Sequence, residues 1–153
     1  MLRISRLTDY GTVVLAHLAC NDAGPVSAAE VAAATGIALP TVSKLLKNLG
    51  KVNIVTSTRG SHGGYQLARE ARAISAADVI DALEGPVSIT TCSATDSHCD
   101  FEAVCSVGGA WQRINLVIRR ALDEISLADL LRSSHPLPRF EFAGTPINVE
   151  RKS

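Results

Sequence analysis

The sequence predicts a mainly α-helical protein built on a winged helix-turn-helix, with a β-hairpin as the wing and a long helix in the C-terminal half. Three observations support this fold class: a capped helix precedes a short glycine turn and an amphipathic helix, a glycine-rich turn joins two β-prone segments, and an amphipathic stretch spans residues 107–125. The 153 residues suffice for one ordinary domain, or a small domain with an appendage. We expect a DNA-binding domain at residues 1–86 and a cysteine-bearing loop at residues 87–106. A long helix with a short following helix is expected at residues 107–131, and an extended or disordered tail at residues 132–153.

The first two helices are predicted from their capping residues. The first is expected to run from about Thr8, its N-cap, to Asn21, with Cys20 as a buried small hydrophobe. Ser27 and Glu30 are spaced as a capping box, in which each side chain accepts a hydrogen bond from the other residue's backbone amide. A second, short helix should therefore begin after Ser27.

A third helix is predicted to open at Leu39-Pro40, because proline in the first turn of a helix loses no hydrogen bond. Its apolar residues recur at helical spacing and form one face, made of Val42, Leu45, Leu46 and Leu49. The opposite face carries small polar and basic residues, namely Thr41, Ser43, Lys44, Lys47 and Asn48. This order of elements is typical of a helix-turn-helix, whose second helix fits the major groove, although an ordinary helical hairpin would show the same pattern.

The segment after this helix favours the DNA-binding interpretation. Residues 52–57 are β-prone, residues 58–64 form a glycine-rich turn, and Tyr65-Gln66-Leu67 returns as a second strand. Such a hairpin directly after a recognition helix is the wing of a winged helix. Its tip carries Arg59, with His62 nearby, and an arginine at this position can enter the narrow minor groove of A·T-rich DNA.

Charge is distributed unevenly along a chain whose net charge is zero. Residues 1–72 contain eight Lys or Arg against four Asp or Glu, a net charge of +4, so the remainder carries −4. Five of the basic residues lie between Lys44 and Arg69, which favours binding of a polyanion. The N-terminus is too polar for a secretory signal and no apolar run is long enough to span a membrane, so we expect a cytoplasmic protein with no membrane partner.

Three of the four cysteines are clustered, at Cys92, Cys99 and Cys105, with six and then five residues between them. In a reducing compartment such a cluster indicates metal binding or redox sensing, and thiolates are the soft ligands that iron–sulfur clusters and zinc select. Three cysteines leave a four-coordinate centre one ligand short. A zinc-stabilised regulator and a cluster-free thiol redox sensor remain alternatives, although the close Cys-x-x-Cys pair usual for zinc is missing.

An enzyme is not expected. The sequence shows no Ser/His/Asp set, phosphate loop or carboxylate pair in an arrangement that suggests turnover, and the glycines at residues 60–64 precede a strand rather than a helix. We therefore expect no small-molecule substrate.

Four motifs, taken in order, resemble the IscR-type family of bacterial winged-helix regulators over about residues 1–131. They are Leu7-Thr8-Asp9-Tyr10-Gly11, the wing sequence at residues 59–68, Ile80-Asp81-Ala82-Leu83-Glu84-Gly85-Pro86, and the three-cysteine loop. Within that family the chain looks most like the regulators of the SUF iron–sulfur assembly system, because of Trp111-Gln112-Arg113-Ile114-Asn115 and Ser126-Leu127-Ala128-Asp129. The resemblance implies a homodimer formed through the long C-terminal dimerisation helix, pairing in antiparallel fashion, and a palindromic operator in double-stranded DNA.

The resemblance also implies that the three clustered cysteines bind a [2Fe-2S] or [4Fe-4S] cluster that controls DNA binding. The histidine that supplies the family's fourth ligand falls at Gly108 in this chain, and the spacing from Cys92 to Cys99 is one residue longer than usual. Asp9 occupies the position at which nitric-oxide-sensing members donate an aspartate from the partner subunit, so Asp9 is the preferred fourth ligand. His98, next to Cys99, is the second candidate for the fourth ligand. The alternative for Asp9 is that it is not a ligand but an ordinary acidic residue in the first turn of a helix, where the helix dipole favours a negative charge.

DNA contacts carry over only where positions match. The resemblance assigns Arg59 to the minor groove and places Ser43 where the family has a glutamate that discriminates between operators. The remaining expected contacts are to bases for Thr41 and Lys44, and to phosphates for Ser27, Lys47 and Lys51. The stimulus could be iron supply, cluster demand, oxidation or nitric oxide.

Overall fold

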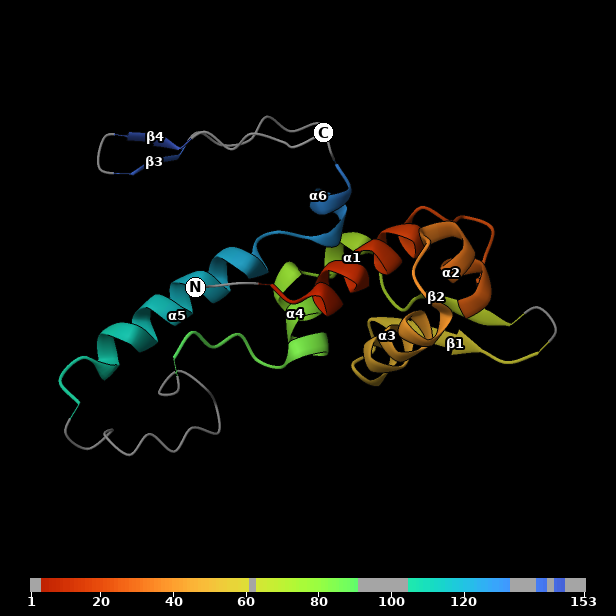
Figure 1. Cartoon of the computed structure of the whole chain (residues 1–153), viewed down its shortest axis with the longest axis horizontal. Helices are drawn as coiled ribbons and strands as arrows, with labels where there is room; N and C mark the ends of the chain where they lie inside the picture. Colours follow the sequence, from red (N-terminus) through yellow and green to blue (C-terminus); the bar gives the residue numbers. More distant parts are fainter. Residues whose placement is uncertain (1–3, 61–62, 91–104, 133–139, 143–144, 148–153) are drawn as a thin grey trace.

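The computed structural model describes residues 4–60, 63–90, 105–132, 140–142 and 145–147. It is mainly helical with a two-stranded antiparallel wing, as the sequence predicts (Figure 1). The elements in chain order are α1 (Arg6–Ala19), α2 (Ala28–Thr35), α3 (Leu39–Lys51), β1 (Val55–Thr58), β2 (Gly64–Leu67), the 3-10 helix η1 (Ala71–Ala73), α4 (Ala76–Glu84), α5 (Gly108–Asp123), α6 (Leu127–Leu131), β3 (Phe140–Phe142) and β4 (Thr145–Ile147).

The core lies between α1, α2, α3 and α4, and α3 contributes the most to it. The whole predicted apolar face of α3 is inaccessible to solvent: Val42, Leu45, Leu46 and Leu49. It packs against α1, α2, α4 and β1. Because this face is completely buried, the polar face of α3 must point outward, and the predicted helix-turn-helix is formed.

The predicted start of α1 is wrong. Ser5, in extended conformation, is the N-cap and accepts hydrogen bonds from the amides of Leu7 (3.2 Å) and Thr8 (3.4 Å). Thr8 lies within the first turn, with a side chain that is only 3% exposed, and its hydroxyl donates to Glu84 of α4. The polar contact to α4 is the physical reason that this threonine is helical rather than a cap.

The prediction that Cys20 is buried is also wrong, because its side chain is exposed at the C-cap of α1. The buried face of α1 includes Val14, Leu15 and Leu18. At about 100° per residue, position 20 lies roughly 200° around the helix from Leu18, so it faces away from the core.

The signals predicted at the starts of α2 and α3 are confirmed. Ser27 and Glu30 form the predicted capping box at the start of α2, and a proline stands in the first turn of α3. Ser75 caps α4 in the same way with Asp78, and Gly85, with φ +93°, follows its last residue. These signals succeed because each one involves residues within a single turn of helix.

The wing is a pair of antiparallel strands in which Val55 lies opposite Leu67 and Thr58 opposite Gly64. The first strand begins three residues later than the β-prone segment, because α3 continues to Lys51 and Asn53 takes a left-handed turn conformation, with φ +56°.

The base of the wing is joined to the helix-turn-helix. The backbone of Tyr65 exchanges two hydrogen bonds with Val26, which comes just before α2. The N–H of Val26 donates to Tyr65 at 2.9 Å, and the N–H of Tyr65 donates back at 2.7 Å. The wing is therefore fixed relative to the N-terminus of α2.

The C-terminal elements return to α4. Ser75 and Ser126 form an isolated antiparallel bridge, in which the Ala76 amide donates to the Ile125 carbonyl at 2.8 Å. The amide of Leu127 donates to the Ile74 carbonyl at 2.7 Å. Between these anchors and the cysteine segment, α5 extends away from the body of the molecule (Figure 1).

In the tail, which was expected to be either extended or disordered, the short strands β3 and β4 pair with each other. Among the described residues no single helix is long and apolar enough to cross a membrane; only α2 and α3 taken together, bent by 120°, meet the same criteria of length and composition.

The close approach of the wing to Val26 predicts the effect of a substitution at Gly64. A Cβ atom added there would lie 2.6 Å from the backbone carbon of Val26, a contact that requires the backbone to shift. We expect Gly64→Ala to lower the free energy of unfolding by about 1–3 kcal/mol, measured by urea denaturation. The matched control is Gly109→Ala, whose added Cβ meets no atom within 4 Å and should leave stability unchanged or slightly raised. Equal unfolding midpoints for the two variants would contradict the tight packing at Gly64.

Candidate nucleic-acid interface and metal centre

The outward face of α3 and the adjoining wing form a continuous polar groove. A hollow of about 620 Å³ lies between them, lined chiefly by polar and basic residues: Ser43, Lys47, Lys51, Asn53, Thr56, Ser57 and Tyr65 among others. Lys44, Lys47 and Lys51 are all exposed, while Thr41 is half-buried at the start of the helix. The structure thus brings most of the predicted DNA-contacting residues of α3 to one open surface, as a helix entering the major groove requires.

Several residues of the groove were not singled out from the sequence, and Thr56 and Asn53 show why. Thr56 lies on β1, where every residue after Val55 is exposed, so the strand pattern alone could have placed it at the surface. Asn53 reaches the groove because of its left-handed backbone, which no spacing rule reveals.

Arg59 follows directly after β1 and is exposed, next to Gly60, whose φ of +120° starts the turn of the wing. The predicted wing contact at His62 lies outside the described residues. The exposed guanidinium is therefore carried away from the core on a hairpin that is anchored at its base.

Ser27 is half-buried at the N-cap of α2, and both of its predicted phosphate-binding groups take part in the cap. Its amide donates to the Glu30 carboxylate at 2.8 Å, and its hydroxyl oxygen accepts from the Glu30 amide at 3.2 Å. The Ser27 side chain first, and the Ser27 amide second, lower the pKa of Glu30 from its ordinary value. A phosphate at this helix end would therefore compete with the Glu30 carboxylate for the Ser27 hydroxyl.

Of the candidate metal ligands in the cysteine segment, the structure describes Cys105. Cys92, His98 and Cys99 lie outside the described residues. Cys105 is half-buried just before α5, and a Cβ atom added at Gly108 would lie 3.6 Å from the Cys105 sulfur. The position expected to carry the family's histidine is thus adjacent to this sulfur, and glycine leaves it without a ligand atom.

Asp9 is exposed in the first turn of α1, beside a hollow of about 580 Å³ that is lined by Ile4, Ser5 and Arg6 as well. Within the described part of one chain, no group of three or more His, Cys, Asp or Glu side chains is close enough to hold a metal ion. The exposed carboxylate is in a position from which it can face a second molecule.

Comparison with known proteins defines the family. The family model of Rrf2, an iron-dependent transcriptional regulator, matches residues 4–133. The chain belongs to the Rrf2 family. It is 34% identical to the protein rrf2 of Nitratidesulfovibrio vulgaris over 139 residues, which cover 90% of this chain and 93% of that protein. The family and its members are transcription regulators rather than enzymes, and this Rrf2 protein is accordingly a DNA-binding regulator of the winged-helix type.

Solved structures of Rrf2-like regulators agree with this assignment. The Bacillus subtilis protein CymR, the global cysteine regulator, superposes with a TM-score of 0.67 at 30% identity, covering 88% of this chain and 100% of that one. The T. potens protein IscR superposes with a TM-score of 0.63 at 32% identity, covering 88% of this chain and 89% of that one. The two likenesses are of comparable strength, and together they establish the family and the fold. Neither one determines which signal controls this regulator, so that question depends on the chemistry of its own residues.

In this Rrf2 protein Glu84, the last residue of α4, ties α4 to the first turn of α1. Its carboxylate accepts hydrogen bonds from the Ser5 amide at 3.0 Å and from the Thr8 hydroxyl. The Thr8 hydroxyl is the main cause that lowers the pKa of Glu84 from its ordinary value, with Ser5 adding to the effect against the opposing effect of burial. Asp9 therefore projects from a helical turn that is held at the end of α4, where the chain continues toward the cysteines.

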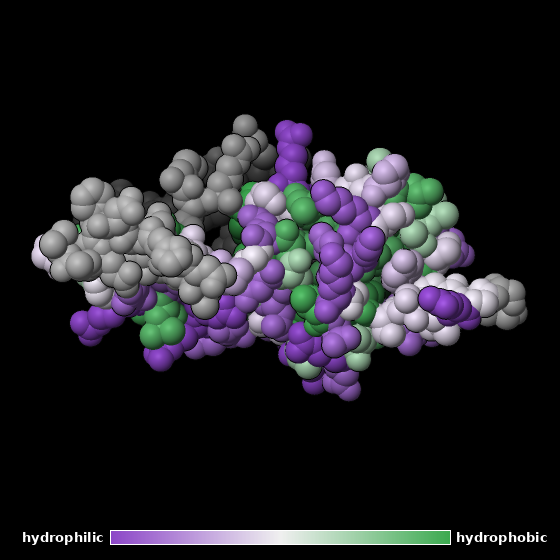
Figure 2. All heavy atoms as spheres, turned by 90° about the horizontal axis from the view of Figure 1, so that it is seen from below, coloured by the Kyte–Doolittle hydropathy of each residue, from purple (hydrophilic) through white to green (hydrophobic). Residues whose placement is uncertain are grey.

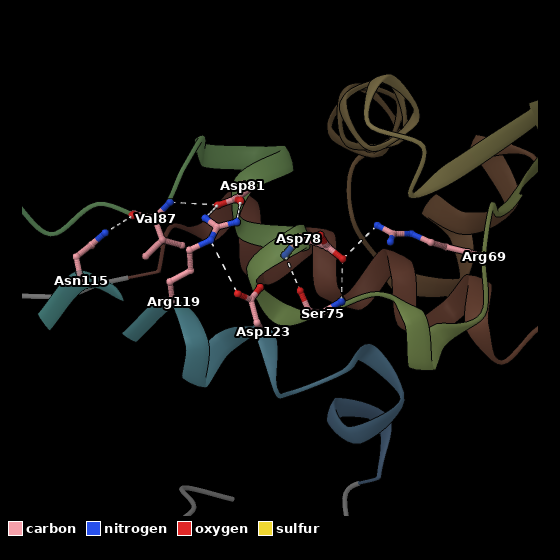
Figure 3. A network of polar contacts seen from close by, with 8 residues as sticks. All are labelled: Arg69, Ser75, Asp78, Asp81, Val87, Asn115, Arg119 and Asp123. Atoms are coloured by element: carbon pink, nitrogen blue, oxygen red, sulfur yellow. Dashed lines mark hydrogen bonds and ion pairs between the residues drawn. The ribbon is translucent and has the colours of Figure 1, made fainter. Parts of the chain in front are cut away.

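A second polar network joins α4 to α5 and to the chain that enters the cysteine segment (Figure 3). Arg119 of α5 donates to both carboxylate oxygens of Asp81, at 2.6 and 3.2 Å, and this bond raises the pKa of Arg119. Asp81 also accepts from the Val87 amide at 3.1 Å. The side-chain amide of Asn115 contacts the same stretch, at Val87 and Ile89.

The bond from Thr8 to Glu84 predicts a pH-dependent stability. A carboxylate whose pKa is lowered in the folded state stabilises it above the pKa of the unfolded state, and this contribution is lost as the pH falls through the folded pKa. We expect Thr8→Val to lower the free energy of unfolding by about 1–2 kcal/mol at neutral pH, and by less as the pH falls toward about 3.

The measurement is urea denaturation at a series of pH values. The matched control is Thr12→Val, because the Thr12 hydroxyl donates to a backbone carbonyl, that of Thr8, at 3.0 Å. Its effect should not change with pH. If the effect of Thr8→Val on the free energy of unfolding is also independent of pH, the Glu84 carboxylate is not the partner of the Thr8 hydroxyl.

Proposed function

We propose that this Rrf2 regulator binds a palindromic operator as a homodimer, and that an iron–sulfur cluster on Cys92, Cys99 and Cys105 controls the binding. The observation that carries the proposal is the position of Cys105, whose sulfur lies beside the first residue of α5. A cluster at this point would adjoin both the helix proposed to form the dimer and the chain that returns to α4. The proposed target genes are those of iron–sulfur assembly or of the response to iron, redox state or nitric oxide.

The operator contacts follow from the groove between α3 and the wing. Thr41, Ser43 and Lys44 would reach base edges, Lys47 and Lys51 the phosphates, and Arg59 with His62 the minor groove beside the wing. Ser27 would donate its hydroxyl hydrogen to a phosphate at the start of α2. A neutral serine at position 43 replaces the family's glutamate, so this regulator should prefer a different base at the matching operator position.

Dimer formation is supported by the surface of α5. None of its residues, all of which the structure describes, is buried within one chain. The predicted apolar stripe divides: Ile118 and Leu122 turn half-buried toward α4, while Trp111, Ile114 and Ile125 remain 43% exposed. Most of the exposed apolar residues recur on one side at spacings of three and four: Val107, Trp111, Ile114, Val117, Ala121 and Ile125. Leu116, 48% exposed, lies on the opposite side.

This exposed stripe at helical spacing suits an antiparallel helix pair with a second copy. Figure 2 shows hydrophobic side chains among hydrophilic ones at the end of the molecule that α5 forms. Two copies joined in this way would present two recognition helices to successive major grooves.

The donor set fits an iron–sulfur cluster, since cysteine thiolates are the usual ligands of such clusters and the chain supplies three of them within one segment. The proposed fourth ligand is Asp9 of the partner subunit, with His98 as the second candidate. The cluster would supply a centre that is gained or lost with iron, oxidants or nitric oxide. Through Glu84, the turn of α1 that bears Asp9 is tied to α4, so a ligand bond to Asp9 would bear on the DNA-binding domain.

A second candidate function uses the same cysteines without a cluster, as a zinc site or as a redox pair that forms a disulfide. It is favoured by the likeness to CymR, a global cysteine regulator, which is as strong as the likeness to IscR. In both alternatives the purified protein would be colourless.

The phosphate contacts predict a change in the salt dependence of DNA binding. For Lys47→Ala, each half of the dimer loses one phosphate contact, so the slope of log K against log salt should fall by about 1.8 for the whole complex. The measurement is fluorescence anisotropy with an operator selected from genomic fragments, over a series of salt concentrations. Arg72→Ala is the control, because Arg72 is equally exposed but lies outside the groove. Equal slopes for both variants would contradict the proposed face.

The cluster proposal predicts the outcome of anaerobic purification followed by iron and sulfide analysis and a visible spectrum. The protein should contain iron and sulfide and absorb visible light, Cys105→Ala should lose both, and Asp9→Ala should alter the spectrum. Cys20→Ala is the control, because this exposed cysteine stands apart from the segment. If Asp9→Ala and His98→Ala both leave the spectrum unchanged, neither supplies the fourth ligand. A colourless protein with zinc, or with an oxidant-induced disulfide, supports the second candidate.

A further inference from the structure

An asparagine stands in the middle of α5, where its intrinsic preference is unfavourable. Asn115 is the eighth residue of a helix of 16, and asparagine is among the weaker helix formers because its side chain competes for backbone hydrogen bonds. It is half-buried on the side of α5 that faces α4, together with Ile118 and Arg119. Its presence calls for a contact that a better helix former could not make.

That contact is a pair of hydrogen bonds to the backbone that leads toward the cysteines. The Asn115 Nδ2 atom donates to the Val87 carbonyl at 3.1 Å (Figure 3), and its Oδ1 atom accepts from the Ile89 amide at 3.2 Å. The two bonds reach residues two apart, in the manner of a β-strand partner. A planar side-chain amide supplies a donor and an acceptor on two separate atoms, whereas an ionised carboxylate only accepts, an aliphatic group does neither, and a hydroxyl has both on a single oxygen.

The same stretch is held from its other side. The Val87 amide donates to Asp81, which is in turn bonded to Arg119, one helical turn beyond Asn115. Side chains of α4 and α5 thus hold three backbone groups of residues 87–89. Asp81 and Arg119 also join the two helices to each other, whereas the hydrogen bonds of Asn115 go to this stretch of chain.

Both ends of the cysteine segment are therefore placed on one helix. The chain is fixed to Asn115 at Ile89, three residues before Cys92, and it returns at Cys105, three residues before Gly108 opens α5. Gly108 and Asn115 are seven residues apart, about 10 Å along a helix axis. Fixing both ends of a loop in advance removes part of the entropy that closing it around a ligand would otherwise cost.

We propose that Asn115 is a positioning residue for a thiolate metal site, which it pre-organises by fixing the entry of the cysteine segment to α5. The inference rests on the proposed metal-binding function but requires only that the thiolates bind a metal. Asn115 itself is not a ligand. Its role is to reduce the freedom that Cys92 and Cys105 must give up when they share one centre.

The test uses Co²⁺ as the probe, titrated anaerobically into the metal-free full-length protein in competition with a chelator and followed by thiolate-to-cobalt absorption. We expect Asn115→Ala to bind Co²⁺ about tenfold more weakly, within the range for residues that orient metal ligands. Asn115→Gln keeps the amide and should recover part of the loss. Arg120→Ala, an exposed change on the same helix, is the control and should bind as the wild type does.

A purely structural role would give a different result. Asn115→Ala would then lower the melting temperature of the metal-free protein while its Co²⁺ affinity stayed at the wild-type value, and this result would overturn the proposal. If the wild type binds no Co²⁺, both the metal function and this inference fail. If it binds Co²⁺ but holds no iron or sulfide when purified anaerobically, the cluster alone is rejected.

A measurement on the wild type makes the test independent of how well the variant folds. If metal binding and the Asn115 contact support each other, Co²⁺ must strengthen the contact by the same factor as the contact strengthens Co²⁺ binding. Hydrogen exchange at the Ile89 amide should therefore slow about tenfold when Co²⁺ binds. An unchanged exchange rate at Ile89, in protein shown to hold Co²⁺, would overturn the proposal even if Asn115→Ala fails to fold.

Discussion

The burial of one face of α3 is the constraint on which the rest of the structure depends. Leu45, Leu46 and Leu49 are completely inaccessible to solvent, and each is worth about 1.5–3 kcal/mol of transfer free energy. A rotation of α3 about its axis would expose these leucines, so the helix is held in one orientation. In that orientation its lysines face outward. The wing is then aligned with this face because Val26, just ahead of α2, pairs with Tyr65.

The short helix α4 links this DNA-binding face to the rest of the chain. Its N-terminal cap, Ser75, is bridged to the cap of α6 at Ser126. Its middle holds Arg119 of α5 through Asp81, and its last residue, Glu84, holds the first turn of α1. Because α5 and α1 are both bonded to this one helix, α4 offers a path between their contacts. In the proposed function, this is the route by which a change near Cys105 would reach the DNA-binding domain.

The sequence predicted what is decided within a few residues and missed what is decided across the fold. The capping box of Ser27 and the polar face of α3 were predicted correctly, because spacing along one helix determines them. The N-cap of α1 was misplaced because Thr8 bonds to a residue 76 positions away, and the Asn115 contact joins residues 28 positions apart. Likewise the clustered cysteines were evident from spacing, whereas Asn53 lines the polar groove between α3 and the wing through a left-handed backbone conformation that hydrophobic spacing does not reveal.

The N-terminal end of α5 explains why metal binding and dimer formation would reinforce each other. Its first two residues, Gly108 and Gly109, are weak helix formers, and its N-cap is Val107, an apolar side chain that cannot accept a hydrogen bond. A helix of 16 residues is marginal in water without tertiary packing, and α5 has no buried residue within one chain. A ligand bond at Cys105 would fix the chain that enters this weak first turn, and pairing with a second α5 would cover the apolar stripe that follows it. Ligand binding at Cys105 and pairing of two α5 helices would each lower the entropy cost of the other, because both require the same turns of α5 to be helical.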